Sequence, residues 1–164
     1  MAIGVTVLTV SDRSFRGERE DLSGPAVCEK IKGYGWALIS TAILPDDLDL
    51  IKDFLFSESQ KSQVDLILTT GGTGFAPRDV TPEATLAILD KRAPGLCEIM
   101  RFEAYKNNKN AILSRAEAGL CGNTLIINLP GNPKGAVENL SIIAPLLPHA
   151  LALVSQIPDF NDFH

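Results

Sequence analysis

The sequence predicts an α/β fold with a mostly parallel sheet, and two patterns carry that prediction. Apolar, largely β-branched runs at residues 3–10, 64–68 and 124–128 alternate with amphipathic helical stretches, and glycines or other turn residues punctuate them. The chain has 164 residues, of which 45% are hydrophobic and 21% charged, so we expect one domain, residues 1–164, with its own core. Residues 157–164 are expected to form a loosely ordered tail.

The first strand is expected at residues 3–10, which are β-branched and nearly uncharged. That composition is typical of a buried parallel strand rather than a half-exposed one. The charged stretch 13–21 that follows is expected to be a loop that is mobile when empty. Ser23 suits a helix cap and Pro25 suits the first turn, so a helix is predicted from there to about residue 32.

A second strand and a second helix are predicted over residues 36–44 and 48–59. The tripeptide Pro45-Asp46-Asp47 ends the strand and caps the helix. One face of this helix is expected to be buried through a stripe of apolar residues, Leu48, Ile51, Leu55 and Phe56.

The middle of the chain begins with a third strand at residues 64–68, which leads into a glycine-rich loop. Helical patterns follow at residues 82–89 and 96–106, separated by Pro94-Gly95. Residues 111–119 are ambiguous, because their periodicity fits neither a helix nor a strand alone.

The C-terminal part begins with a strand over residues 124–128, which ends in the rigid turn Leu129-Pro130-Gly131-Asn132-Pro133. A last helix is predicted over residues 134–154. Pro145 and Pro148 should bend it or divide it into stages.

Four of the predicted turns follow strands at the same polarity. Right-handed crossovers bring the carboxyl ends of parallel strands to one edge of a sheet, so we expect these turns to converge on one cleft. They are Ser11-Asp12, Pro45-Asp46, Gly71-Gly72-Thr73-Gly74 and Pro130-Gly131-Asn132-Pro133. The glycine loop lacks side chains that would shield its amides, so it can hold phosphates, although it matches neither the P-loop nor the GxGxxG pattern.

Composition and charge argue against several classes of function. The net charge is −5, from 15 basic and 20 acidic residues, so we expect no broad basic surface for nucleic acid. The widely spaced Cys28, Cys97 and Cys121 indicate buried free thiols in a reducing cytosol. The N-terminus shows no signal-peptide pattern and no apolar run is long enough to span a bilayer, so a cytoplasmic protein without a membrane partner is expected.

Several of these motifs together resemble one known family. They are Gly71-Gly72-Thr73-Gly74, Pro77-Arg78-Asp79-Val80-Thr81-Pro82-Glu83-Ala84, Ser114-Arg115 and Leu129-Pro130-Gly131-Asn132-Pro133, with Val10-Ser11-Asp12, Ser23-Gly24-Pro25 and Pro45-Asp46 also fitting. In this order and spacing they resemble the molybdenum cofactor biosynthesis proteins MogA, the G domain of plant Cnx1 and the G domain of gephyrin. The resemblance covers residues 3–154.

The resemblance implies a three-layer α/β/α fold with a mixed, mostly parallel sheet, and a homotrimer. It also implies molybdopterin adenylyltransferase activity, in which ATP and molybdopterin give adenylyl-molybdopterin and pyrophosphate with Mg²⁺. A downstream molybdate-inserting protein would consume the product. The separate MoaB branch shares the fold, but the glycine loop, residues 77–84 and the long polar loop after Asp12 favour the MogA branch.

The family positions also imply roles for individual residues. Asp79 and Asp46 are expected to be catalytic and to hold Mg²⁺. Nucleotide binding is expected at Gly71, Gly72, Thr73, Gly74, Ser114, Pro130, Gly131, Asn132 and Pro133. Substrate binding is expected at Ser11, Asp12, Ser23, Gly24, Arg78 and Arg115.

Plainer structural interpretations stay open for several of these residues. Asp79 could simply cap the helix after it, and Asp46 could belong to an ordinary helix start. Arg78 could neutralise phosphate or pair with a neighbouring carboxylate, and Ser114-Arg115 could be a polar strand end.

Three other functions compete with the adenylyltransferase. The first is a MoaB-like pterin-binding protein with weak or different catalysis. The second is a scaffold of the kind that gephyrin became, for which 164 residues leave no room for extra domains. The third is a pyridine-nucleotide salvage enzyme like the N-terminal domain of CinA, which would need a second domain or different loop residues.

Overall fold

A six-stranded mixed sheet forms the middle layer of the protein, in the order β2-β1-β3-β6-β5-β4. The computed structural model describes residues 2–156, so the tail predicted at residues 157–164 lies outside the described residues. The parallel strands are β2 (Ala37–Leu44), β1 (Gly4–Val10), β3 (Leu66–Thr70) and β6 (Thr124–Leu129). At one edge, β5 (Ala118–Cys121) pairs antiparallel with β6, and β4 (Lys91–Arg92) pairs antiparallel with β5.

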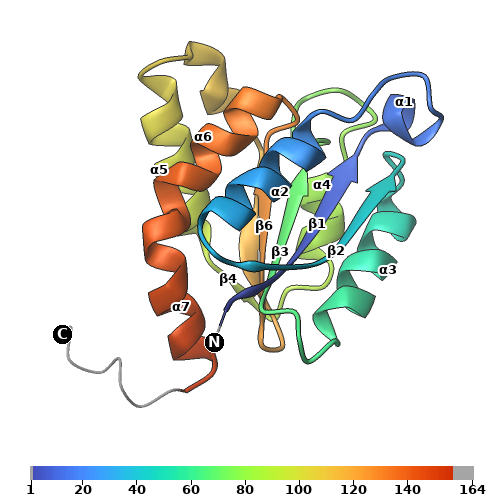
Figure 1. Cartoon of the computed structure of the whole chain (residues 1–164). Coiled ribbons are helices and arrows are strands. Elements are labelled where there is room, and N and C mark those ends of the chain that lie inside the picture. Colours follow the sequence, from blue (N-terminus) through green and yellow to red (C-terminus); the bar gives the residue numbers. More distant parts are fainter. Residues whose placement is uncertain (1, 157–164) are drawn as a thin grey trace.

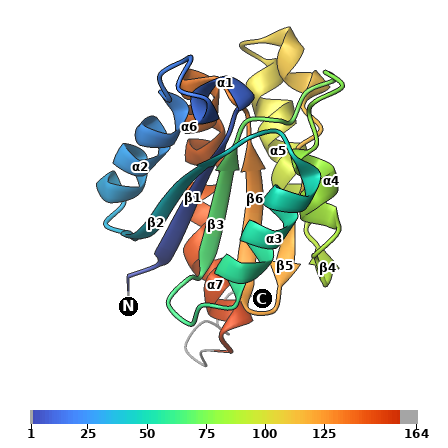
Figure 2. The same cartoon turned by 90° about the vertical axis from the view of Figure 1, so that its right-hand side faces the viewer.

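Helices cover both faces of the sheet and complete the expected three layers (Figure 1 and Figure 2). One face carries α2 (Ser23–Gly33), α5 (Pro94–Tyr105), α6 (Pro133–Ile143) and α7 (Leu147–Val154). The other face carries α3 (Leu48–Ser59) and α4 (Thr81–Leu86). The α/β prediction and the mostly parallel sheet are therefore confirmed.

Alternate residues of the central strands point into two separate cores. On the α2 side, Val5 and Val7 of β1 pack with Leu140 of α6. On the α3 side, Leu8 of β1 packs with Ile51. The central strands β1, β3 and β6 are buried on both faces and carry long apolar runs, which is why the sequence pattern could find them, whereas the edge strand β2 is only partly buried.

The segment after β1 differs from the sequence prediction. Residues Asp12–Phe15 form a one-turn helix, α1, where a loop was expected. The hydroxyl oxygen of Ser11 accepts a hydrogen bond from the amide of Ser14 at 3.2 Å and so caps this turn. At the start of α2 the prediction that Ser23 caps the helix is wrong, because the carboxylate of Asp21 accepts from the amide of Gly24 at 3.1 Å instead.

Two further predictions need correction. The buried stripe of α3 is narrower than expected, since Ile51 and Leu55 are buried but Leu48 and Phe56 are exposed. The ambiguous stretch 111–119 is divided between the end of a 3₁₀ helix, η1 (Lys109–Leu113), and the start of β5.

The C-terminal helical stretch is staged at its prolines, as predicted. A 3₁₀ turn, η2 (Ala144–Leu146), separates α6 from α7. By length and composition alone, the stretch Pro133–Val154 would suffice to cross a membrane, with a mean hydropathy of 1.5. A third of the apolar window is buried, and its residues Leu140, Ile143 and Leu147 pack in the core on the sheet.

Candidate functional site

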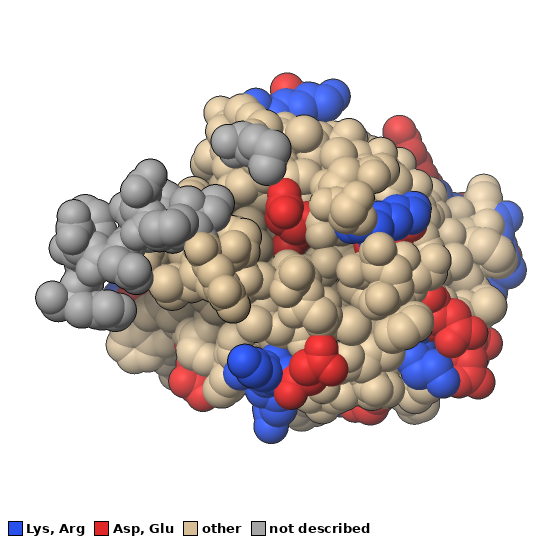
Figure 3. Space-filling view, turned by 90° about the horizontal axis from the view of Figure 1, so that it is seen from below, with Lys and Arg blue, Asp and Glu red and all other residues tan. Residues whose placement is uncertain are grey.

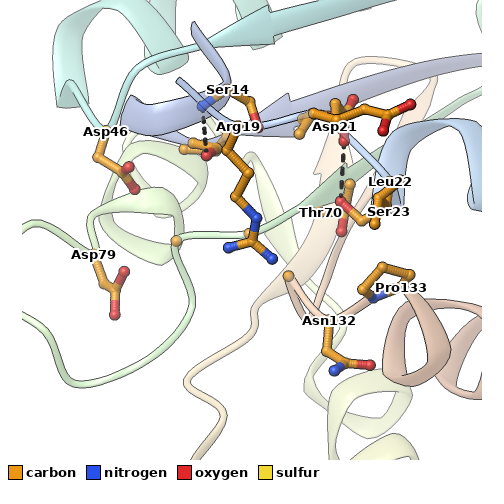
Figure 4. Close-up of a pocket in the computed structure, with 17 residues that line it drawn as sticks. Ser14, Arg19, Asp21, Leu22, Ser23, Asp46, Thr70, Asp79, Asn132 and Pro133 are labelled. Atoms are coloured by element: carbon orange, nitrogen blue, oxygen red, sulfur yellow. Dashed lines mark hydrogen bonds between the residues drawn. The ribbon is translucent and has the colours of Figure 1, made fainter. Parts of the chain in front are cut away.

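The carboxyl ends of the parallel strands meet at a cavity of about 380 Å³. All four predicted turns contribute to its lining, through Ser11, Asp46, Gly71, Gly72, Gly131, Asn132 and Pro133. Asp79 lines the same cavity, which we call the cleft (Figure 4). The predicted convergence of separate turns is therefore confirmed, and Asp79 lies on the same side of the molecule as the turn at residues 131–132.

The glycine loop forms the floor of the cleft in a conformation that side chains would disfavour. Gly71 has φ of 105° and Gly72 has φ of 69°, both in the left-handed region. A Cβ on Gly71 would collide with the carbonyl oxygen of Val10. The hydroxyl of Thr81 donates to the carbonyl of Gly71 at 2.9 Å, and the amide of Thr81 donates to that of Gly72 at 3.1 Å. The start of α4 therefore fixes the loop against the sheet.

Two carboxylates, Asp46 and Asp79, face one side of the cleft (Figure 4). Asp46 is tied to the end of β1 by a reciprocal pair of hydrogen bonds. Its carboxylate accepts from the amide of Asp12 at 3.0 Å, and its own amide donates to the carboxylate of Asp12 at 3.0 Å. Burial raises the pKa of Asp46, and the nearby charges of Asp12 and Asp79 raise it further.

The carboxylate of Asp79 has one hydrogen-bond partner in the described chain, the amide of Ala76 at 3.0 Å. It does not cap α4, because Val80 occupies the cap position without a side-chain hydrogen bond. Asp47, not Asp46, caps α3 by accepting from the amide of Leu50 at 3.0 Å. Neither Asp46 nor Asp79 caps a helix, so both carboxylates are available for another role.

The two arginines predicted to bind substrate are engaged by protein groups. Arg78 makes a bidentate ion pair with Asp12, at 2.9 and 2.8 Å, and this contact holds the pKa of Asp12 below its ordinary value. Of the alternatives for Arg78, pairing with a neighbouring carboxylate is the one observed. Arg115 donates to the carbonyl oxygens of Gly74 at 2.8 Å and Asp79 at 2.9 Å, and pairs with Glu83.

A second cavity, of about 440 Å³, adjoins the cleft at Asn132, which lines both. The other side of the glycine loop borders it through Thr73 and Gly74. Its remaining lining is rich in carboxamides and includes Asn107, Asn108, Asn110, Ser114, Pro130, Lys134 and Asn139. Asn132 is held in place as the cap of α6, where its side-chain oxygen accepts from the amide of Gly135 at 3.0 Å.

The predicted site residues thus divide into three groups. Ser11, Ser23, Asp46, Gly71, Gly72, Asp79, Gly131, Asn132 and Pro133 line the cleft. Thr73, Gly74, Ser114, Pro130 and Asn132 line the second cavity. Asp12, Gly24, Arg78 and Arg115 line neither cavity. Their substrate contacts, and the roles of the lining residues, stay predictions.

Sequence reasoning missed several residues of the cleft. Thr9, Ser14, Arg19, Glu20, Asp21 and Thr70 line it without having been singled out. The signal that could have found Arg19 and Asp21 was the charged stretch 13–21, which directly follows the end of a buried strand.

Comparison with known proteins gives one family match and several close relatives. Residues 6–149 match the family described as "Probable molybdopterin binding domain". The chain is 43% identical, over 93% of its length, to a Helicobacter pylori (strain J99) protein named molybdopterin adenylyltransferase, of which it covers 88%. It is also 43% identical, over 90% of its length, to the Drosophila melanogaster molybdenum cofactor synthesis protein cinnamon, but it spans only a quarter of that longer protein.

A solved structure of a protein from the same area of metabolism has the same fold as this chain. The crystal structure of the molybdopterin biosynthesis enzyme MoaB from Thermus thermophilus superposes with a TM-score of 0.89 at 48% identity. The match covers 95% of this chain and 98% of that one.

Proposed function

The chain belongs to the molybdopterin-binding domain family of molybdenum cofactor biosynthesis proteins, and from this membership we propose that it is a molybdopterin adenylyltransferase. It would transfer AMP from ATP to the terminal phosphate of molybdopterin and release pyrophosphate. The observation that carries this proposal is the junction of two cavities at Asn132, with the glycine loop between them. A reaction between two bulky substrates needs two adjoining sites whose contents can meet.

The proposed reaction needs no protein nucleophile. An oxygen of the pterin's terminal phosphate forms a bond to the α-phosphorus of ATP, and the bond from that phosphorus to the bridging oxygen of pyrophosphate breaks. The nucleophile is already an anion, so positioning and charge neutralisation are the tasks left to the protein. The cysteines suit this account, because they are buried and burial raises the pKa of Cys97 to about 12.

Asp46 and Asp79 would hold the Mg²⁺ that we propose as the cofactor. Burial and neighbouring carboxylates raise the pKa of Asp46, so a cation beside it would relieve an unfavourable charge. Within residues 2–156, no cluster of three or more His, Cys, Asp or Glu residues is arranged to hold a metal. Two carboxylates with substrate phosphates and water fit Mg²⁺, which seldom uses an all-protein cage. When bound, the ion would neutralise charge on the transferred phosphate and on pyrophosphate.

The amides of the glycine loop would position the nucleotide's phosphates. Gly72 lines the cleft and Gly74 lines the second cavity, so one loop can contact substrate on both sides. Arg115 keeps the loop in register by bonding the carbonyls of Gly74 and Asp79. Asp79 would therefore be presented to the cleft on a backbone anchored at both ends.

The experiment that tests the proposal is a pyrophosphate-release assay with purified protein. Release should require molybdopterin, ATP and Mg²⁺ together, and should stop when EDTA removes the ion. If pyrophosphate were released at the same rate without molybdopterin, the reaction would be hydrolysis of ATP, and this would contradict the proposal.

A second candidate function is a MoaB-like molybdopterin-binding protein with weak or different catalysis. It is favoured by the 48% identity to the Thermus thermophilus structure titled MoaB. The preference for the MogA branch stays a prediction. The same assay separates the two, because this candidate predicts pterin binding, measured by fluorescence, without pyrophosphate release.

We further propose that the protein acts in the cytoplasm as a homotrimer and passes its product to a molybdate-inserting protein. Family membership is what supports these three points.

A further inference from the structure

The charged groups that line the cleft include one cation. Of the described residues there, Glu20, Asp21, Asp46 and Asp79 are acidic and Arg19 is basic. The substrates of the proposed reaction carry several phosphate charges, and a cleft of this composition would repel them. The Mg²⁺ proposed above would offset part of that repulsion, and a basic side chain in the cleft would offset more of it. Arg78 and Arg115 do not line the cleft, so Arg19 is the arginine placed to do it.

The guanidinium of Arg19 has no competing partner in the described part of the chain. No hydrogen bond or ion pair of its side chain is present among residues 2–156, although four carboxylates line the same cleft. Figure 4 shows the side chain reaching from its loop into the space between Asp79 and Asn132. Arg16, three residues earlier, is paired instead: its guanidinium makes a bidentate ion pair with the carboxylate of Glu18, at 3.0 and 3.1 Å.

The loop that carries Arg19 is anchored at both ends. On one side the amide of Glu18 donates to the carbonyl of Arg13 at 2.9 Å. On the other side Asp21 accepts from the hydroxyl of Thr9 at 2.8 Å and from the amide of Gly24 at 3.1 Å. These contacts order the backbone around Arg19, so binding an anion would cost the rotamer entropy of the side chain but would not require the loop to be ordered as well.

We propose that Arg19 is a phosphate-binding residue of the cleft, which holds a phosphoryl group of the substrate by charge-assisted hydrogen bonds. A guanidinium presents a planar fork of donors that matches two phosphate oxygens. The inference rests on the proposed function for the identity of the phosphate. That phosphate belongs either to the leaving pyrophosphate or to the terminal monoester of the pterin, and the two can be separated by experiment.

The test is equilibrium binding of inorganic pyrophosphate and, separately, of inorganic phosphate, measured by calorimetry without Mg²⁺. Arg19→Gln removes the charge at similar length, Arg19→Lys keeps the charge without the fork, and Arg16→Gln is the matched control on the same loop. We expect Arg19→Gln to weaken binding about tenfold, Arg19→Lys to weaken it less, and Arg16→Gln to leave it unchanged. The loss should shrink at high salt, because Arg19 is exposed.

The two binding measurements decide whether Arg19 binds phosphate and which phosphate it binds. A larger loss for pyrophosphate assigns Arg19 to the leaving group, and a larger loss for phosphate assigns it to the pterin monoester. Wild-type affinity in Arg19→Gln, or no binding of either anion by the wild-type protein, would overturn the inference. Binding does not depend on adenylyl transfer, so a normal binding result without turnover would reject the proposed function and leave the role of Arg19 standing.

Discussion

At the scale of single residues, the acidic groups of the cleft differ in how firmly the protein holds them. Asp46 exchanges hydrogen bonds with Asp12, and Asp12 is in turn clamped by Arg78. Asp79 has the amide of Ala76 as its partner. Asp46 is thus built into a rigid network, whereas Asp79 has oxygen capacity left for a metal ion or a substrate.

Asp79 can therefore be changed with little effect on the fold. We expect Asp79→Asn to lower kcat for pyrophosphate release by roughly a hundredfold, because the metal ion loses a charged ligand. The melting temperature should stay close to the wild-type value, since the asparagine oxygen can still accept from Ala76. Asp49→Asn, on the exposed side of α3, is the control and should change neither quantity. Wild-type turnover in Asp79→Asn would show that the metal assignment is wrong.

Glu58 is a buried carboxylate far from this chemistry, and it makes stability depend on pH. Burial alone would raise its pKa, but hydrogen bonds from Lys61, Ser40 and Thr6 outweigh burial and lower it. A depressed pKa means that the folded state favours the charged form. Its contribution is therefore present above the ordinary carboxyl pKa of 4.5 and is lost as the pH falls through the folded value.

Glu58→Gln should accordingly lower the free energy of unfolding at neutral pH by about 1–3 kcal/mol. The difference from wild type should narrow as the pH drops below about 4.5, as measured by urea denaturation at several pH values. The exposed Glu29→Gln is the control and should show no such narrowing. A difference that stays constant down to the lowest pH at which the protein folds would rule out this account of Glu58.

At the scale of elements, the site depends on how β3, the glycine loop and α4 are joined. Thr81, at the start of α4, bonds the carbonyls of both Gly71 and Gly72. Gly131 of the neighbouring turn approaches so closely that a Cβ on it would lie 3.2 Å from the Cα of Gly71. The two turns that are proposed to hold the nucleotide therefore touch through backbone, with no side chain between them.

Gly71→Ala tests this junction. A side chain there would be strained by the positive φ and would collide with Val10, so we expect about 1–3 kcal/mol of destabilisation. Pyrophosphate release should also fall, because the floor of the cleft moves. Gly33→Ala is a matched control at the end of α2, where a Cβ meets nothing within 4 Å, and it should be neutral or stabilising by up to about 1 kcal/mol. Equal stability of the two variants in thermal unfolding would contradict the proposed strain.

Sequence patterns predicted the elements whose physical cause is local. β1, β3 and β6 are buried on both faces, so apolar residues dominate their sequences, which stand out from their surroundings. β4 is only Lys91–Arg92, and its strand conformation comes from pairing with β5, which no local pattern reveals. The cap that creates α1 was visible in principle, because Ser11 is a residue type favoured at helix N-caps and the amide three residues later can donate to it.

The site could be predicted only in part for a similar reason. Turns that follow parallel strands lie at the same edge of the sheet, and the four predicted turns all line the cleft there. Which arginine is free to face the cleft depends on which of the other arginines form ion pairs with carboxylates. Arg78 and Arg115 carry motif positions yet are paired with Asp12 and Glu83, while Arg19 carries no motif and reaches the cleft.

At the scale of the whole molecule, the distribution of charge differs between the cleft, where four carboxylates gather, and the opposite end of the sheet. Seen from below, at the amino ends of the parallel strands, Lys and Arg side chains are scattered among acidic and uncharged residues (Figure 3). Elsewhere several large apolar side chains are exposed, including Phe75 at 70% and Phe102 at 61%. Exposed apolar side chains that form a contiguous patch are often covered by another copy of the chain or by a partner, whereas scattered ones are ordinary.

The predicted homotrimer can be tested directly by sedimentation. We expect a mass near that of three 17.6 kDa chains at micromolar concentration, because association would cover exposed apolar surface. A Phe102→Asp variant shows whether α5 contributes, with Asp49→Asn on α3, which covers the other face of the sheet, as the control. Sedimentation of the wild-type protein at the mass of one chain would contradict the trimer.

The central claim is that the cleft and the second cavity together bring the α-phosphate of ATP to the terminal phosphate of molybdopterin. The most direct measurement is mass spectrometry of the pterin after incubation with protein, Mg²⁺ and ATP labelled at the α-phosphate. The account predicts a pterin heavier by one adenylyl group that carries the label, with an equal amount of pyrophosphate. An unmodified pterin, under conditions in which the Helicobacter pylori relative forms the adduct, would contradict it.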